Sequence, residues 1–490
     1  MPSAACRHSG GNMSKTFVYL VYFGLYSLAI LIIGKSSFGE SDSISKFFVG
    51  ERKIGVCRLF FTFVGTWISA ATILGYTGNV YQNGVAVISM SVIPWFIGAV
   101  MLYAITDRLY GNDIFTIPQL IRNRYGSKGL QILSALFMAG GYVLYLVMQI
   151  KGFGIAASNL LNIDYKVAVF LVYLFILYST FGGFNSVTKT DAVNLIMLAI
   201  SVGVIYFVIV GKVEGAWLLT DGTVARETMK AGAVVEQKGL FQDYSPLMYI
   251  SMFFGWGMGL ATNPQYMVRI IAAKDKKTAK RMLLCAMGFL AVFYFALTQI
   301  GLGLKILFPH LETFCATDDI FVYAIDHLLH TRFSGFFLIS VIGACLSTAN
   351  SQLLLIGSML SYDVAGQFGR NGMKEEKLLV WARWFIFIGG TLSLILSINP
   401  PGNILFFGAD VWGAFAVVFT PLIYGALLYP KGTKAGAYAA FITGVLCSLL
   451  LWGRTTRVYW AFPATACSVF AYLLISYIDR KWGMRDEMAE

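Results

Sequence analysis

Apolar runs of about 20 residues, the length of a helix that crosses the hydrocarbon core of a membrane, recur along this whole chain. No other feature constrains the fold as strongly. The 490 residues are 57% hydrophobic and only 13% charged, and their mean hydropathy is +0.70. Soluble domains carry roughly 25% charged residues. The sequence therefore predicts an all-α polytopic membrane protein.

Thirteen such runs are predicted as spans. They lie at residues 16–34, 59–80, 84–106, 130–160, 166–182, 190–211, 246–268, 282–304, 334–363, 378–398, 402–428, 434–452 and 458–478. An odd number places the two termini on opposite sides. The connections on one side carry more than twice as many Lys and Arg residues as those on the other. Because short basic loops stay in the cytoplasm, we expect a cytoplasmic C-terminus, an outside N-terminus and a plasma (inner) membrane location.

Composition excludes several other classes. The net charge of +12 is explained by the basic cytoplasmic loops, so no nucleic-acid partner is expected. The seven cysteines form no CxxC pair, so neither a disulfide framework nor a zinc site is predicted. No Walker, GxGxxG or HExxH sequence occurs, which gives ATP-driven transport and common hydrolytic chemistry no support. Residues 1–12 differ in character from the rest, and we interpret them as an extraneous tail before Met13.

The ninth apolar run, residues 335–364, is polar in its middle. Ser347, Asn350 and Ser351 lie at i, i+3 and i+4 and so share one helix face, with Thr348 beside them. Hydroxyl and carbonyl oxygens are the ligands that a hard cation such as Na⁺ takes. Alternatively, small hydroxylated residues form a face on which membrane helices pack closely. Both interpretations stay open at this point.

The second run, residues 61–80, is unlike a plain lipid-facing helix. It carries Gly65, Gly75 and Gly78 among several hydroxyl side chains, a composition tolerated where a membrane helix is interrupted beside a cavity. The alternative is a continuous helix that packs tightly. Two inverted repeats of five helices would bring the second and ninth runs together.

Six segments, in this order, make the chain similar to the sodium:solute symporter family from about Lys46 to the C-terminus. They are FFVGERKIG (47–55), GTWISAATILGYTG (65–78), TIPQLIRNRYG (116–126), TFGGFNSVTKTDAVN (180–194), NPQYMVRIIAAKD (263–275) and ACLSTANSQLLL (344–355). The family includes sugar, proline, pantothenate and sialic acid transporters, and the general character of residues 400–452 is most like the pantothenate type.

The resemblance implies a LeuT-like fold of two inverted five-helix repeats. The expected organisation is a tail (1–14), an extra helix with a cytoplasmic loop (15–57), the first repeat (58–211), an external loop (212–245), the second repeat (246–428) and two peripheral helices with a cytoplasmic tail (429–490).

The resemblance also implies a sodium site. It would use the carbonyls of Gly65, Ile68 and Ala344 and the hydroxyls of Ser347 and Thr348. In some members a second sodium is held by an aspartate with hydroxyls of the ninth span. The matching residues here are Asp191, Ser347, Asn350 and Ser351. A structural alternative is that Asp191 caps the sixth span together with Thr190.

The solute positions carried over from the family are Trp67, Ser69 and Thr72 in the second span, Ser91 in the third, and Asn263 and Tyr266 in the seventh. Gln149, Lys151 and Asp410 are polar groups within apolar runs and are further candidates. Lys151 either faces a substrate carboxylate or extends to an interface, and Asp410 could pair with a cationic group of the solute. Arg269, which precedes a basic run, is expected to be a cytoplasmic anchor.

The sequence therefore predicts a secondary-active symporter that imports a small polar organic solute with sodium by alternating access. A carboxylate, vitamin, amino acid or sugar acid is expected. The sugar transporters' Glu-Gln pair is Ala71-Thr72 here and the proline transporters' acidic residue is absent, which argues against those two substrates. The other functions considered are a sodium-independent facilitator, a membrane solute sensor and, with only four histidines in the chain, an embedded enzyme. We expect no organic cofactor and a monomer or weak oligomer.

Overall fold

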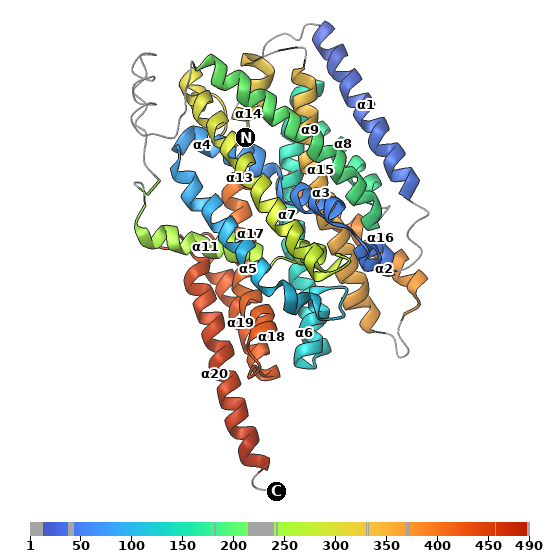
Figure 1. The fold of residues 1–490 in the computed structure, drawn as a ribbon, viewed down its shortest axis with the longest axis vertical. Coiled ribbons are helices and arrows are strands. Elements are labelled where there is room, and N and C mark those ends of the chain that lie inside the picture. Colours follow the sequence, from blue (N-terminus) through green and yellow to red (C-terminus); the bar gives the residue numbers. More distant parts are fainter. Residues whose placement is uncertain are drawn as a thin grey trace.

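The computed structural model describes residues 13–37, 44–180, 183–213, 240–241, 244–329, 331, 333–368, 373–455 and 457–487 (Figure 1). Across these residues the regular structure is helical, and the one β feature is an isolated parallel bridge between Ile54 and Ala273. Most of the predicted tail 1–14 and of the external loop 212–245 lies outside the described residues.

In the N-terminal half, some helices continue into short π-helical segments. The elements are α1 (Met13–Ser37), α2 (Ile44–Val49), α3 (Val56–Trp67), η3 (Ala71–Tyr76), α4 (Thr77–Asn83), η4 (Ile88–Val92), α5 (Ile93–Tyr110), α6 (Ile117–Tyr125), α7 (Lys128–Leu161), α8 (Tyr165–Thr180) and α9 (Gly183–Lys212).

The C-terminal half is built in the same way. Its elements are α11 (Pro246–Ala261), α12 (Pro264–Ile271), α13 (Lys276–Leu307), α14 (Ile320–Tyr323), α15 (Ser334–Ser358), η7 (Met359–Val364), α16 (Glu375–Ser397), α17 (Ile404–Phe419), η9 (Thr420–Tyr424), α18 (Gly425–Leu428), α19 (Lys434–Leu451) and α20 (Ala461–Glu487).

Ten helices in the described part of the chain are long and apolar enough to cross a membrane, and one bent helix pair supplies an eleventh candidate. Each of the thirteen predicted spans coincides with a helix or with a run of consecutive helices. The spans predicted at 166–182 and 246–268 correspond to shorter helices, so the count of thirteen stays a prediction. The all-helical class is confirmed.

The helix α15 lies at the centre of the protein. Its apolar window is entirely buried, whereas the windows of α1, α19 and α20 are only 22–33% buried. α15 packs against α7, α9 and α16, while α19 and α20 pack on each other, and in Figure 1 the red α20 extends below the other helices. The polar residues of α15 therefore face protein rather than lipid.

The second predicted span is interrupted, as the sequence indicated. α3 and the helical segment that follows it are bent by 56° to each other, and Ile68 between them has an extended backbone (φ −77°, ψ 113°). The break does not lie at a glycine. Gly65 and Gly75 instead allow close packing, since a Cβ on them would lie 3.1 Å from the Ser347 hydroxyl and 3.0 Å from the Leu405 backbone nitrogen.

Gly78, near the end of this span, leaves no room for a side chain. A Cβ at this position would overlap the carbonyl of Thr317, in the loop before α14. We expect Gly78→Ala to cost about 1–3 kcal/mol of unfolding free energy, because backbone must move to relieve the overlap. Thermal unfolding of the purified chain checks this, with Gly140→Ala on α7 as the control, since nothing lies within 4 Å there. Equal melting temperatures would contradict the prediction.

Candidate functional site

The centre of the site is the hydroxyl of Thr348 on α15. It lies 3.2 Å from the carbonyl oxygen of Thr66 and 3.4 Å from those of Ile68 and Ala344. A hydroxyl has one proton and can donate to only one of these carbonyls at a time. The break at Ile68 therefore produces a buried cluster of neutral oxygens with more acceptors than donors, which is the ligand chemistry of a hard cation.

Ser347 connects this cluster to a carboxylate. Its hydroxyl lies against Gly65 and donates to Asp191 of α9 at 2.5 Å. The structure thus brings the five predicted sodium residues of α3 and α15 into one region. The carbonyl of Thr66 was missed, because the position of the break decides which backbone oxygens become free and the sequence does not specify it.

Asp191 is fully buried and is not a helix cap. Its carboxylate also accepts a hydrogen bond from Thr62 at 2.6 Å. α9 begins at Gly183, eight residues earlier, and Thr190 donates to carbonyls of its own helix. The capping interpretation is therefore wrong, and Asp191 is a buried carboxyl group that is hydrogen-bonded to α3 and α15.

Arg269 is the principal correction to the sequence analysis. Arg269, predicted as a cytoplasmic anchor, is a residue of α12. Its side chain is only 2% exposed and lies between α12, α3 and α15. Its guanidinium donates to the carbonyls of Thr62 at 3.1 Å and Gln265 at 2.5 Å, and to the hydroxyls of Thr66 and Ser351. A rigid fork of five N–H donors suits such a position. Thr62 links Arg269 to Asp191, since its carbonyl accepts from the guanidinium and its hydroxyl donates to the carboxylate.

Three residues of the predicted second sodium set lie together, since Ser347 contacts Asp191 and Ser351 donates to the carbonyl of Ser347 at 3.1 Å, whereas Asn350 is engaged elsewhere. Asp191 and Ser347 are in contact, but the side-chain oxygen of Asn350 accepts from Thr180 of α8 at 3.0 Å. Ser351 is hydrogen-bonded to Thr66 at 2.8 Å and receives a guanidinium hydrogen bond from Arg269 at 2.6 Å. A positively charged side chain thus already occupies part of this region.

Several predicted solute residues surround the break. Trp67 donates to the hydroxyl of Tyr294 at 3.1 Å, and the hydroxyl of Thr72 lies 3.3 Å from the same oxygen. The side-chain oxygen of Gln149 accepts from the backbone N–H of Ala70 at 3.1 Å. Thr72 also donates to the carbonyl of Trp67, at 3.3 Å. Side chains thereby satisfy backbone groups that the break leaves without helical partners.

Other predicted solute residues are engaged elsewhere. Ser69 is buried beside Tyr145, whereas Ser91 donates to the carbonyl of Val87 in its own helix. Asn263 caps α12 and accepts from Tyr142 at 2.5 Å. Asp410 accepts from Tyr459 and from Trp460, both at 2.7 Å, so the protein itself satisfies this carboxylate.

Six buried aromatic side chains form a closed circuit next to the break. Consecutive ring centroids are 5.5, 5.7, 5.1, 4.7 and 5.2 Å apart, and the Trp67–Tyr294 hydrogen bond closes the circuit. The members, in order, are Trp67, Tyr266, Trp412, Trp256, Trp95 and Tyr294, from α3, α12, α17, α11, α5 and α13. Sequence analysis found only Trp67 and Tyr266, because the others come from helices whose mutual arrangement the sequence does not show.

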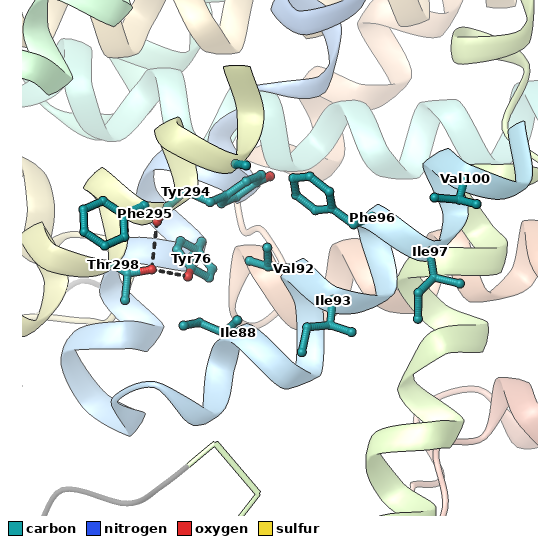
Figure 2. Close-up of a pocket in the computed structure, with 11 residues that line it drawn as sticks. Tyr76, Ile88, Val92, Ile93, Phe96, Ile97, Val100, Tyr294, Phe295 and Thr298 are labelled. Carbon is teal, nitrogen blue, oxygen red and sulfur yellow. Dashed lines mark hydrogen bonds between the residues drawn. The ribbon is translucent and has the colours of Figure 1, made fainter. Parts of the chain in front are cut away.

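A cavity of about 470 Å³ lies behind Tyr294 (Figure 2). Along α5 its rim consists of Ile93, Ile97 and Val100, which are exposed. At its inner end the hydroxyls of Tyr76 and Thr298 are 2.6 Å apart. Its lining contains no charged residue, and its polar side chains are those of Tyr76, Tyr294 and Thr298.

Lys151 lies at a second location, beside a cavity of about 680 Å³ formed with the connections before α14 and α17. Its ammonium group is 2.7 Å from Asp318 and 2.7 Å from the carbonyl of Gly402. Asp318 also accepts from the backbone N–H of Ile404 at 3.1 Å. Lys151 therefore neither extends alone to an interface nor faces the break; it is paired within the protein.

Asp319, next to this ion pair, allows a pH prediction. Burial, with repulsion from Asp318, raises its pKa to about 6. A carboxyl whose pKa is raised on folding favours the folded state when protonated, so stability falls as pH rises from about 4 to about 6. We expect Asp319→Asn to be more stable than the parent at pH 7.5 and similar to it at pH 4.5. Thermal unfolding at both values checks this, with Asp479→Asn on the exposed side of α20 as control.

Comparisons with known proteins agree with this geometry. A sequence model of the sodium:solute symporter family matches residues 47–444. The osmoregulated proline transporter OpuE of Bacillus subtilis (strain 168) is 26% identical, covering 94% of this chain and 95% of the relative. A sodium/proline symporter of Staphylococcus aureus (strain JH9) is 24% identical over 99% of this chain and 96% of its own.

A solved structure shares the fold. It is the substrate-bound outward-open state of a Na⁺-coupled sialic acid symporter, with a TM-score of 0.77, 16% sequence identity and coverage of 94% of this chain and 98% of that one.

Proposed function

Because the chain belongs to the sodium:solute symporter family, we propose that it imports a small polar organic solute together with sodium by alternating access. It is a multi-pass membrane transporter and not an enzyme. The observation that carries the proposal is the Thr348 hydroxyl, which lies among carbonyl oxygens from α15 and from the broken second span.

Sodium would be held by the carbonyls of Gly65, Ile68 and Ala344 and the hydroxyls of Ser347 and Thr348, with the carbonyl of Thr66 as an additional ligand. Neutral oxygens give a weak, reversible site. An ion that bridges two helices stabilises the conformation in which they are together, and any solute that prefers the same conformation then binds more tightly. The transport of sodium and of the solute is coupled because both prefer the same conformation.

We propose one sodium per cycle at this site. A second ion at Asp191 would have to compete with Arg269, whose guanidinium already supplies a positive charge and is hydrogen-bonded to Ser351. Asn350, directed toward Thr180, would have to change partners. The ratio of charge to solute moved, measured in proteoliposomes, distinguishes one ion from two.

The solute is proposed to bind where the break meets the aromatic circuit. Trp67, Ser69, Thr72, Gln149 and Tyr266 would contact it. Ser91, Asn263, Lys151 and Asp410 are assigned structural roles instead, because each is engaged by other groups of the protein.

We further propose the thirteen-span topology, with the C-terminus cytoplasmic and the two repeats at 58–211 and 246–428, in the plasma membrane. The distribution of basic residues among the connections supports the orientation. The extra helix would be α1, and α19 and α20 would be the two peripheral helices.

Reconstitution tests the function. The purified chain in proteoliposomes should accumulate a labelled solute when an inward sodium gradient is applied. Replacing sodium with potassium at equal ionic strength should abolish the accumulation. Uptake that only equilibrates, and does so equally in both salts, would indicate a sodium-independent facilitator and contradict the proposal.

A further inference from the structure

In the described part of the chain, no Lys or Arg side chain lies over a ring of the aromatic circuit. All six rings are at most 4% exposed. The cation–π contacts among the described residues fall on other rings, those of Phe115, Tyr125, Phe184, Tyr103 and Tyr81. A cation is attracted to the face of a Trp or Tyr ring when it lies within about 6 Å of the centroid. The circuit is thus a buried electron-rich surface without a cation.

The same region contains buried donors that have no acceptor. Within the described chain, the indole N–H groups of Trp95 and Trp412 and the amide NH₂ of Gln149 make no hydrogen bond. Gln149 is held by its oxygen at Ala70 and lies one helical turn from Tyr145, which stacks on Trp412 with centroids 5.5 Å apart. A buried donor without a partner is energetically unfavourable, and a bound acceptor removes this cost.

These two observations determine the charges of the ligand. A carboxylate has two oxygens and accepts several hydrogen bonds, so it satisfies unpartnered donors. Ring faces attract a positive group but offer no strong acceptor. A primary ammonium would bring three N–H donors that need acceptors, whereas a fully alkylated ammonium brings none. The unpartnered N–H groups are donors only, and the one unpartnered hydroxyl among the six rings, that of Tyr266, is too few acceptors for three N–H groups.

We infer that the solute is a small zwitterion in which a carboxylate is joined to an alkylated ammonium group. The alkylated cation would lie against the aromatic circuit, and the carboxylate would accept from Trp95, Trp412 and Gln149. A sugar or a plain sugar acid lacks the cation that the rings favour. This inference rests on the solute site proposed above, and it narrows the solute to one chemical class.

Binding of a matched ligand set tests the inference directly. The purified full chain is titrated in sodium chloride, with tryptophan fluorescence as readout. Glycine betaine is compared with 3,3-dimethylbutanoate, which replaces the cationic nitrogen by carbon, with choline, which lacks the carboxylate, and with glycine, which lacks the methyl groups. Proline and N,N-dimethylproline form a second pair. We expect the methylated zwitterion to bind at least about 10-fold tighter than its partners in one of the two series.

Three results would overturn the inference. One is measurable and equal binding of dimethylbutanoate and glycine betaine, which would make the cation irrelevant. Another is measurable binding of choline that equals or exceeds that of glycine betaine, which would make the carboxylate irrelevant. The third is that neither methylated zwitterion binds better than its unmethylated parent. All of these comparisons use the unaltered protein, so none requires that a substituted protein folds.

Variants of Trp256 then test the rings. Trp256→Leu should weaken glycine betaine binding by about 10-fold while leaving dimethylbutanoate unchanged, and Trp256→Phe should weaken it less. Trp384→Leu, on the exposed face of α16, is the control. An equal loss for both ligands in Trp256→Leu would show that the ring contributes only packing. Binding is measured without a sodium gradient. If the protein failed to couple transport to sodium, the order of ligand affinities would be unchanged, and the result would contradict only the proposed function.

Discussion

Thr348→Val is expected to weaken sodium activation of uptake by about 100-fold, since groups that merely support a metal's ligands already contribute about 10- to 100-fold to affinity. Valine keeps the shape of threonine but replaces the hydroxyl with a methyl group. That methyl group would face the carbonyls of Thr66, Ile68 and Ala344. The carbonyls would lose their shared hydrogen-bond donor, and the sodium site would lose one oxygen ligand. Sodium titrations of initial uptake rates in proteoliposomes measure the effect.

The control is Thr465→Val on α20, a buried threonine whose hydroxyl donates to the carbonyl of Ala461 at 2.7 Å, within its own helix. Both variants lose one buried hydroxyl, so a general loss of stability would affect them alike. A sodium dependence of Thr348→Val equal to that of the control would exclude this oxygen cluster as the sodium site.

Asp191→Asn and Arg269→Gln are each expected to lower the unfolding free energy by about 1–3 kcal/mol, the usual cost of leaving buried hydrogen-bonding groups without partners. Asp191 would lose the charge that accepts from Thr62 and Ser347, and Arg269 would lose four described hydrogen-bond partners. The double variant should be more stable than the sum of the two losses predicts, because neither charge is then left alone.

Chemical unfolding of the four proteins in detergent gives this double-mutant cycle. Lys280→Gln is the matched control, since Lys280 pairs with Asp107 at the surface and such exposed pairs contribute little to stability. Strictly additive losses in the cycle would mean that Asp191 and Arg269 do not act as a pair. In that case the argument for a single sodium ion would also fail, because it relies on the guanidinium as the cation beside Asp191.

The two polar spans were predictable because hydroxyl and glycine residues within an apolar run are visible in the sequence. Their convergence was predictable only from the family's repeat architecture. The carbonyl of Thr66 was not, since it depends on where the backbone leaves the helix. Arg269 was misassigned because it directly precedes a genuinely exposed basic run, and only tertiary packing separates it from Lys276 and Lys277.

The aromatic circuit could not be predicted from the sequence either. Trp95, Trp256 and Trp412 belong to three different helices, and apolar aromatic residues in a membrane protein are equally consistent with contact to lipid. Lys151 and Asp410 were visible as unusual charges, but their partners Asp318, Tyr459 and Trp460 are far away in the chain. A sequence shows that a buried charge needs a partner without showing which residue it is.

The bend at Ile68 receives part of its hydrogen bonding from neighbouring helices, while the Ile68 N–H still donates to the carbonyl of Val64 in α3. Thr348 of α15 and Gln149 of α7 hold groups that a continuous helix would satisfy internally. The conformation of this bend therefore depends on contacts with α7 and α15. When α7 or α15 shifts, its backbone must find new partners, and the cost of finding them is one barrier between the conformations of the transport cycle.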